Sequence, residues 1–171
     1  MKFYILPYIE IDGIRTLTNS QVMGIYDQME CDGSLRWVFF QGGIKSREDF
    51  LTLMKSDDHR FYAIVNESNT IVAIFWMNSF EMKLARLHFN VFNHAWAHTD
   101  KIMKVGMEYL YNLKDANNNT MFTRFLGILP TCNISAVKFL VRNGGTIVGT
   151  VPDLYWDHIG NKSVEGTILY F

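Results

Sequence analysis

The chain has 171 residues, of which 49% are hydrophobic and 15% aromatic, and its formal net charge at pH 7 is −1. This length and composition suit one domain with a sizeable core over residues 1–171, and they exclude an intrinsically disordered chain. The balanced charge, with no cluster of Lys and Arg, argues against nucleic acid as a partner. No apolar run approaches the roughly 20 residues that span a bilayer, so we expect no membrane association.

The cysteines and the N-terminus predict where the protein resides. Cys31 and Cys132 lie far apart and form no C-x-x-C pair. Free thiols in an intracellular protein are the simpler interpretation, and a single bridge is the alternative. Residues 1–8 are too short and too soon interrupted by Pro7 for a signal peptide. We therefore expect a cytoplasmic protein.

The N-terminal third contains one strand and two helices by its local patterns. Residues 2–6 predict a strand, and residues 8–18 fit no single pattern. Asn19 or Ser20 can cap a helix, which Asp32 and Gly33 end. The Ser46 and Asp49 pair has nearly the spacing of a capping box and predicts a second helix.

The apolar segment 35–40, followed by a turn at 41–43, is open to two interpretations. We expect it beside the substrate, because loops carry specificity on many scaffolds. An ordinary buried aromatic segment is an equally good interpretation.

A hairpin and a central unit follow. Residues 61–65 and 70–77 predict two antiparallel strands, because a polar turn cluster separates them. Residues 84–92 alternate between apolar and polar side chains, with Arg86, His88 and Asn90 on one face of the predicted strand.

The pattern becomes helical from Asp100, where apolar residues recur at three- and four-residue steps. Residues 121–129 predict another strand, and a short helix after Asn133 ends at glycine. Residues 146–151 and 164–171 predict a terminal hairpin. The order predicts an α+β fold, a mixed and mostly antiparallel sheet covered by helices.

The central unit resembles the GNAT superfamily of acyl-CoA N-acyltransferases. Asn133, Ala136 and Gly144 fit the family's pattern of an Asn that opens a helix, an Ala three residues later and a Gly that ends the helix. The pattern's next aromatic is Gly145 here, and the pyrophosphate loop between Val91 and Asp100 contains no glycine. The resemblance implies about seven strands flanked by about four helices, with a splay between two strands for the pantetheine arm.

The resemblance also implies acetyl-CoA as co-substrate. A helix start offers unpaired N–H groups and a positive dipole end, which suit a pyrophosphate. The residues expected to bind the cofactor come from the strand, the loop after it and the second helix start: Phe89, Val91, Ala95, Trp96, Ala97, His98, Thr99 and Asn133.

Three residues are candidates for proton transfer. The family often places its general base on the strand of His88, and a histidine has a suitable pKa near neutral pH. Glu81, just upstream, is the other candidate for the base. The family's usual acid, a Tyr, corresponds to Leu140 here, and Tyr155 is the substitute by residue type alone.

Two classes of function follow from the resemblance. The first is an N-acetyltransferase that transfers an acetyl group to an unidentified primary amine. The second is a non-catalytic GNAT-like structural or interaction module, which the glycine-free loop and the missing Tyr favour. Small acyltransferase-like proteins with degenerate loops also occur in bacteriophages. His94 and His98 lack a third ligand at metal spacing, so no metal site is expected. The apolar content also suits a homodimer.

Overall fold

The computed structural model describes all residues, 1–171. Its main sheet has seven strands in the order β1-β4-β5-β6-β7-β9-β8. The strands are β1 (Phe3–Pro7), β4 (Arg60–Asn66), β5 (Ile71–Glu81), β6 (Leu84–Val91), β7 (Arg124–Pro130), β8 (Thr146–Asp157) and β9 (Lys162–Tyr170). All neighbours are antiparallel except β6 and β7. The predicted α+β class is confirmed.

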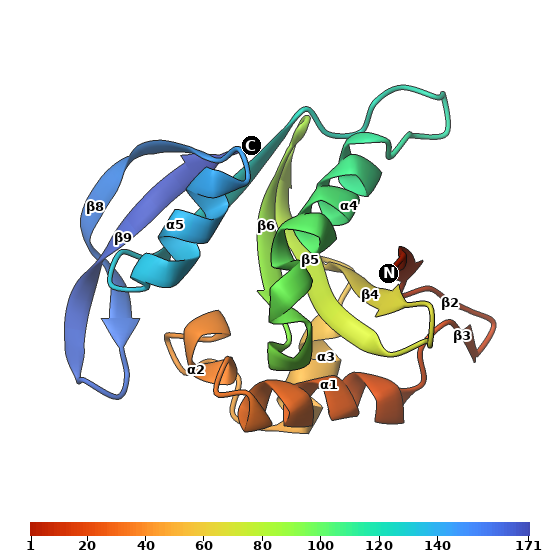
Figure 1. Ribbon diagram of the computed structural model, residues 1–171, viewed down its shortest axis with the longest axis horizontal. Coiled ribbons are helices and arrows are strands. Elements are labelled where there is room, and N and C mark those ends of the chain that lie inside the picture. The colour runs from red at the N-terminus through yellow and green to blue at the C-terminus, as the bar shows by residue number, and fades with distance from the viewer.

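Five α-helices and one 3₁₀ helix surround this sheet (Figure 1). They are α1 (Asn19–Cys31), α2 (Leu35–Val38), α3 (Arg47–Met54), the 3₁₀ helix η1 (Asn93–His98), α4 (Thr99–Tyr111) and α5 (Ile134–Arg142). A small hairpin, β2 (Glu10–Ile11) and β3 (Ile14–Arg15), occupies part of the stretch with no clear pattern. None of the helices is long and apolar enough to cross a membrane.

The sheet separates two hydrophobic cores because successive side chains of a strand point to opposite faces. Phe75 and Leu87 belong to the core that α4 covers. Ile74 and Trp76, which alternate with Phe75 along β5, belong to the core beneath α1 and α3. Since Trp76 pairs with His88 in the register, the polar face of β6 lies on the α1–α3 side.

Capping side chains fix where the first helices begin. The N-cap of α1 is Thr18, and not Asn19 or Ser20 as was predicted. The side chains of Thr18 and Gln21 form a reciprocal capping box, which fixes this start. The pair predicted for α3, Ser46 and Asp49, forms such a box as expected.

One local expectation needs correction. The residues expected as a loop after β6 form the 3₁₀ helix η1, which leads directly into α4, and 3₁₀ turns are frequent at helix starts. The segment 35–40, for which no secondary structure was predicted, begins as the short helix α2. The helix whose pattern begins at Asp100 starts one residue earlier, at Thr99.

The parallel pair β6–β7 is short, and its end creates an opening in the sheet. Only three residues of each strand pair, the last being Arg86 with Leu126, although β6 continues to Val91 and β7 to Pro130. In Figure 1 the strands β8 and β9 turn away from β6 beyond this point, and helix α5 lies between them and β6. We call the point after the last pair the fork. It is the splay that the family resemblance implied.

Candidate functional site

A buried tyrosine from β8 reaches the fork. The Tyr155 hydroxyl donates a hydrogen bond to the Ile128 carbonyl at 2.7 Å and accepts one from the Arg86 guanidinium at 3.2 Å. Phe125 exchanges backbone bonds with Phe171 on the β9 side, so the alternation of β7 turns the Ile128 carbonyl towards β6. Burial raises the pKa of Tyr155, and the nearby Arg86 opposes this rise. The hydroxyl is therefore a protonated donor at neutral pH.

His88, two residues after Arg86 on the same face, heads a chain of side-chain hydrogen bonds. His88 Nε2 lies 3.3 Å from Asn78 Oδ1, and Asn78 Nδ2 lies 3.2 Å from His59 Nε2. His59 Nδ1 lies 2.7 Å from Ser56 Oγ. An amide oxygen can only accept, so His88 Nε2 carries the proton and Nδ1 carries a free lone pair.

The His88 ring is also held by packing. It stacks on Trp76 with ring centroids 4.7 Å apart and planes at 1°. Burial first, and then the positive charges of Arg86 and His59, lower the pKa of His88 to about 3. The imidazole is therefore neutral throughout the physiological range, as expected for a base. The same low pKa makes Nδ1 a weak proton acceptor.

The pKa shift predicts an acid-sensitive fold. The unfolded state binds a proton at His88 near its ordinary pKa of 6.5, whereas the folded state does so only near 3, so stability falls as pH falls between these values. From pH 6.5 to 5 the free energy of unfolding should drop by about 1.5 kcal/mol through this group. Chemical denaturation of wild type and His88→Gln at both pH values measures the drop.

The matched control is His94→Gln, which removes an exposed histidine from η1. It should keep the acid-dependent loss of stability, while His88→Gln should lack it. An equal pH dependence in all three proteins would contradict a partly buried, neutral His88.

Two polar atoms on the same face of β6 have no partner. Arg86 Nε and Asn90 Nδ2 are both buried without a hydrogen bond, and Asn90 is only 8% exposed. Arg86 forms no ion pair. Buried donors are normally satisfied, so both atoms need a partner that the protein itself does not supply.

Several backbone N–H and C=O groups at the end of β6 and in the first helical turns after it already have hydrogen-bond partners within the protein. The Asn93 amide donates to the Asp32 carboxylate at 2.8 Å. The Trp96 indole donates to the Val91 carbonyl at 3.1 Å, which covers one group on the open edge of β6. Thr99 Oγ1 donates to the Trp96 carbonyl at 2.5 Å. Ala95 is buried, whereas Ala97 is exposed and His98 partly exposed.

A carboxylate stands at the first turn of α4 and ties this helix to α5. Asp100 Oδ1 accepts bonds from Arg142 at 2.6 and 3.1 Å and from Asn143 at 2.9 Å. The bond from Asn143 and then that from Arg142 lower the pKa of Asp100. Asp100 is thus an anion at the helix end that the positive dipole favours.

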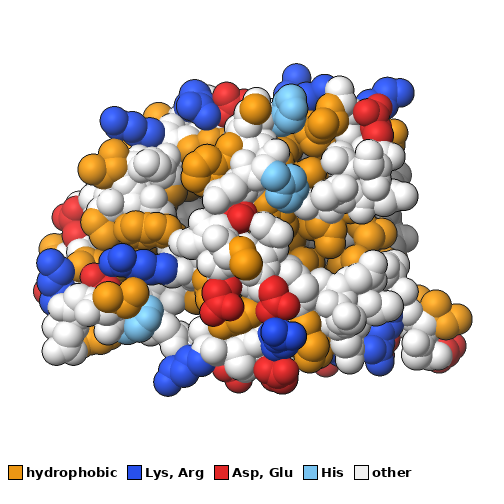
Figure 2. Space-filling view, turned by 60° about the horizontal axis from the view of Figure 1, so that its bottom comes forward, with side chains coloured by type: hydrophobic (Ala, Val, Ile, Leu, Met, Phe, Trp, Pro, Cys, Tyr) orange, Lys and Arg blue, Asp and Glu red, His pale blue; other side chains and the backbone are white.

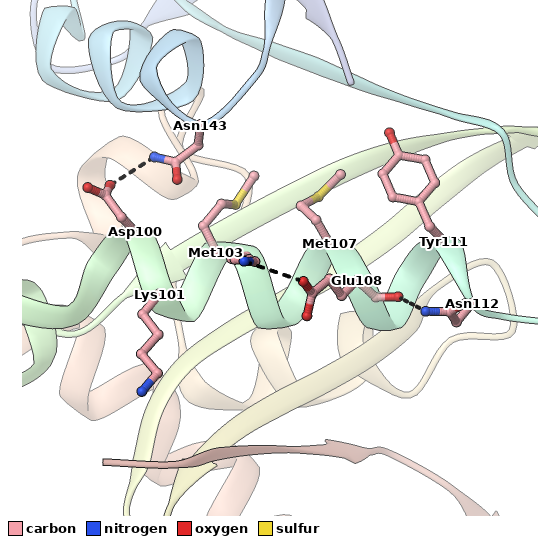
Figure 3. A pocket seen from close by; sticks show the side chains of 9 residues that line it. Asp100, Lys101, Met103, Met107, Glu108, Tyr111, Asn112 and Asn143 are labelled. Atoms are coloured by element: carbon pink, nitrogen blue, oxygen red, sulfur yellow. Dashed lines mark hydrogen bonds and ion pairs between the residues drawn. The ribbon is translucent and has the colours of Figure 1, made fainter.

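A groove of about 700 Å³ runs along α4 from Asp100 to Tyr111, with Asn143, the C-cap of α5, at its rim. Figure 3 shows Met103, Met107 and Tyr111 on the side of α4 that faces α5, and Asp100 pointing to Asn143. The groove therefore has an apolar wall and a polar end at the start of α4.

The second predicted helix start has the expected cap. Asn133 Oδ1 accepts from the Ala136 amide at 3.2 Å, which leaves the side-chain NH₂ free. Phe139 of the same helix stacks on Phe89 of β6 with centroids 6.4 Å apart, so α5 lies against the open edge.

The structure brings some of the predicted site residues together and separates others. Tyr155 is hydrogen-bonded to Arg86 at the fork, and the charge of Arg86 acts on His88 two residues further along β6. Glu81 is exposed at the far end of β5, five residues from Trp76, or about 16 Å along the strand. His94 and His98 belong to no cluster of three metal-ligating side chains.

Sequence reasoning missed Asn78, His59 and Asp32. The alternation of β5 could have placed Asn78 on the Trp76 face, but the contacts of His59 and Asp32 depend on chain segments distant in sequence.

Comparisons with known proteins agree with this architecture. No family model and no curated protein matches the sequence. Among solved structures, spermidine N-acetyltransferase from Vibrio cholerae in complex with CoA and spermine has a TM-score of 0.75 at 8% identity, with 99% of this chain and 94% of that chain covered. An acetyltransferase of the GNAT family from Streptococcus pneumoniae has a TM-score of 0.65 at 12% identity, with 99% of each chain covered.

These likenesses define the class of the fold. The chain has the fold of the GNAT N-acetyltransferases, as the sequence resemblance predicted. That resemblance covered roughly residues 60 to 171, whereas the structural likeness covers 99% of the chain. One of the structures that share this fold, the spermidine N-acetyltransferase, is a complex with CoA and spermine.

Proposed function

We propose that the protein is an N-acetyltransferase that transfers an acetyl group from acetyl-CoA to a primary amine. The observation that carries the proposal is the fork, where two parallel strands separate beside a helix start and a buried Tyr155 and a neutral His88 lie next to the opening.

The residues present fit acetyl-CoA as co-substrate. The unpaired backbone edges beyond Arg86 and Leu126 can bond the amides of the pantetheine arm, and the free NH₂ of Asn133 can donate to the same arm. The groove along α4 offers an apolar wall, and Arg142 offers a cation for a phosphate. The proposed set from the strand, the turn after it and the second helix is Phe89, Val91, Ala95, Trp96, Ala97, His98, Thr99 and Asn133.

Proton transfer is assigned to two residues at the fork. Bound acetyl-CoA supplies an activated acetyl thioester. His88 Nδ1 accepts a proton from the amine as the N–C bond forms, and the Tyr155 hydroxyl donates its proton to the sulfur as the C–S bond breaks. An ammonium loses two protons in becoming an amide: one goes to solvent and one restores Tyr155. Glu81 remains the alternative base, and from its exposed position it would accept the proton through solvent.

Ligand-induced stabilisation tests the proposal. CoA at 100 times its dissociation constant should stabilise the fold by about 2.7 kcal/mol, seen as a rise in melting temperature. Asn133→Ala loses both the helix cap and the amide donor, whereas Asn133→Ser keeps a cap and loses the amide. We expect both to weaken CoA binding and only Asn133→Ala to lower stability, by about 1 kcal/mol.

The same preparation incubated with acetyl-CoA and mixed primary amines should release CoA, detected by mass spectrometry. A melting temperature that stays flat across millimolar CoA, together with no CoA release, would refute the proposed function.

The negative charge of Asp100 at the start of α4 leads to a separate prediction. Asp100 competes with a phosphate for the helix dipole and for Arg142, so Asp100→Asn should tighten CoA binding by about 2- to 5-fold, and Arg142→Gln should weaken it. Asp12→Asn, which removes the same charge from an exposed turn, is the control. Equal CoA affinities of wild type and Asp100→Asn, measured by calorimetry at low salt, would show that the phosphates of CoA do not bind at this helix start.

A specific observation favours the alternative, a non-catalytic GNAT-like module. Asp32 and Trp96 already bond groups that a cofactor would use, and no glycine lets the turn after β6 approach a phosphate. In that case CoA would neither stabilise the protein nor be released, and the fold would serve as an interaction surface. The CoA experiments above distinguish the two functions.

A further inference from the structure

The unpartnered groups on β6 bear on the identity of the acceptor amine. The face that carries Arg86, His88 and Asn90 lies on the α1–α3 side of the sheet, whereas Leu87 and Phe89 face α4 and α5. If the acetyl thioester enters from the α4 side, the amine must approach from the α1–α3 side. The chemistry of that face then selects the amine.

This face is cationic and has no acid to balance it. Arg86 is permanently charged, donates only to Tyr155, and keeps a buried Nε without a partner. Besides burial, which is the largest cause in both cases, the charged groups that act on the pKa of His88 are Arg86 and His59, and the one that acts on the pKa of Tyr155 is Arg86. A partly buried cation without a counter-ion is costly, so its natural partner is an anion brought by a ligand.

Asn90 adds a second unsatisfied donor on the other side of His88. Alternate residues of a strand lie about 6.7 Å apart, so Arg86 and Asn90 flank His88 at about equal distances. Nδ2 of Asn90 is buried and unpaired, and this residue is more than nine-tenths buried. A ligand whose amine lies at His88 can thus place one oxygen group at Arg86 and another at Asn90.

We propose that the acceptor is an amino acid whose carboxylate binds Arg86 and whose second oxygen group binds Asn90. The proposal rests on the proposed function and names the substrate class of the same site. A polyamine is disfavoured because its additional ammonium groups would meet Arg86 with no carboxylate nearby. Long-range charge does not decide the choice, since Figure 2 shows acidic and basic side chains interspersed on the face it displays.

Aromatic side chains close this face. Phe39 stacks on Trp76 at 5.8 Å, and Phe40 meets Tyr155 edge-on at 6.1 Å. They come from the segment that follows α2, which the sequence had indicated as a substrate region. A covered, low-dielectric surrounding strengthens the attraction between Arg86 and a carboxylate.

The test compares four amines with saturating acetyl-CoA: L-glutamine, L-alanine, L-alaninamide and spermidine. L-glutamine carries both oxygen groups, L-alanine only the carboxylate, L-alaninamide no carboxylate, and spermidine several charges of the wrong sign. We expect kcat/KM to fall in that order, by at least about 10-fold from L-alanine to L-alaninamide, as for loss of a charge-assisted bond.

Variants assign the preference to residues. Arg86→Gln should remove the advantage of L-alanine over L-alaninamide, and Asn90→Ala should remove that of L-glutamine over L-alanine. Arg60→Gln, an exposed arginine on β4, is the matched control and should keep both. Stabilisation by CoA should survive in every variant, which shows that each remains folded.

A binding measurement makes the test independent of turnover. L-glutamine at 10 mM should raise the melting temperature of the CoA complex of wild type but not of Arg86→Gln. Faster acetylation of spermidine or L-alaninamide than of L-alanine would overturn the proposed acceptor while leaving the acetyltransferase function intact. Lack of any effect from CoA itself would instead overturn the function on which the inference rests.

Discussion

His88→Ala is expected to lower the turnover number by about 10²-fold while leaving the affinity for CoA nearly unchanged. General bases contribute about 10²–10⁴-fold, and the low end applies because the pKa of His88, about 3, makes Nδ1 a weak acceptor. Steady-state rates and CoA calorimetry on the same preparations give the two quantities.

The pH profile adds a second criterion. Because His88 stays neutral down to about pH 3, the wild-type turnover number should show no inflection near pH 6.5 that belongs to this residue. The matched control is His94→Ala on η1. Full turnover in His88→Ala would exclude His88 as the base and make Glu81 the next residue to replace.

Trp76→Ala is expected to lower the free energy of unfolding by about 3–5 kcal/mol. Trp76 is 2% exposed, stacks on both His88 and Phe39, and belongs to the core beneath α1 and α3, so its removal leaves a large cavity. Total stabilities of single domains are about 5–15 kcal/mol, so this variant is close to unfolding. Denaturant titration measures the loss.

The control for this variant is Trp156→Ala on β8. Trp156 is 49% exposed, and a surface substitution of this kind usually changes stability by less than about 0.5 kcal/mol. A loss below about 1 kcal/mol for Trp76→Ala would show that the stack on His88 does not hold the site.

The structure also relates the two variants. Without the Trp76 ring, water reaches His88, and the burial that lowers its pKa is relieved. At low temperature, where Trp76→Ala remains folded, the pKa of His88 should move upward, which NMR titration of the imidazole would detect. Stability and the chemistry of the fork thus depend on the same stack.

Local periodicity determined much of the fold. The alternation along β6 placed Arg86, His88 and Asn90 on one face, and the three- and four-residue steps after Asp100 predicted α4. Asn133 was recognised as a helix start from the family's spacing of Asn, Ala and Gly, and the structure confirms the cap. These features depend on neighbours within about one turn or one pleat, so the sequence itself specifies them.

The geometry of the site was decided by tertiary structure. Tyr155 and Arg86 are 69 residues apart, Arg142 and Asp100 are 42 apart, and Asn93 and Asp32 are 61 apart. Such contacts follow from strand register and helix packing, which no local pattern contains. The low pKa of His88 arises in the same way, because burial under α1–α3 and the charges of Arg86 and His59 act together only after the sheet has formed.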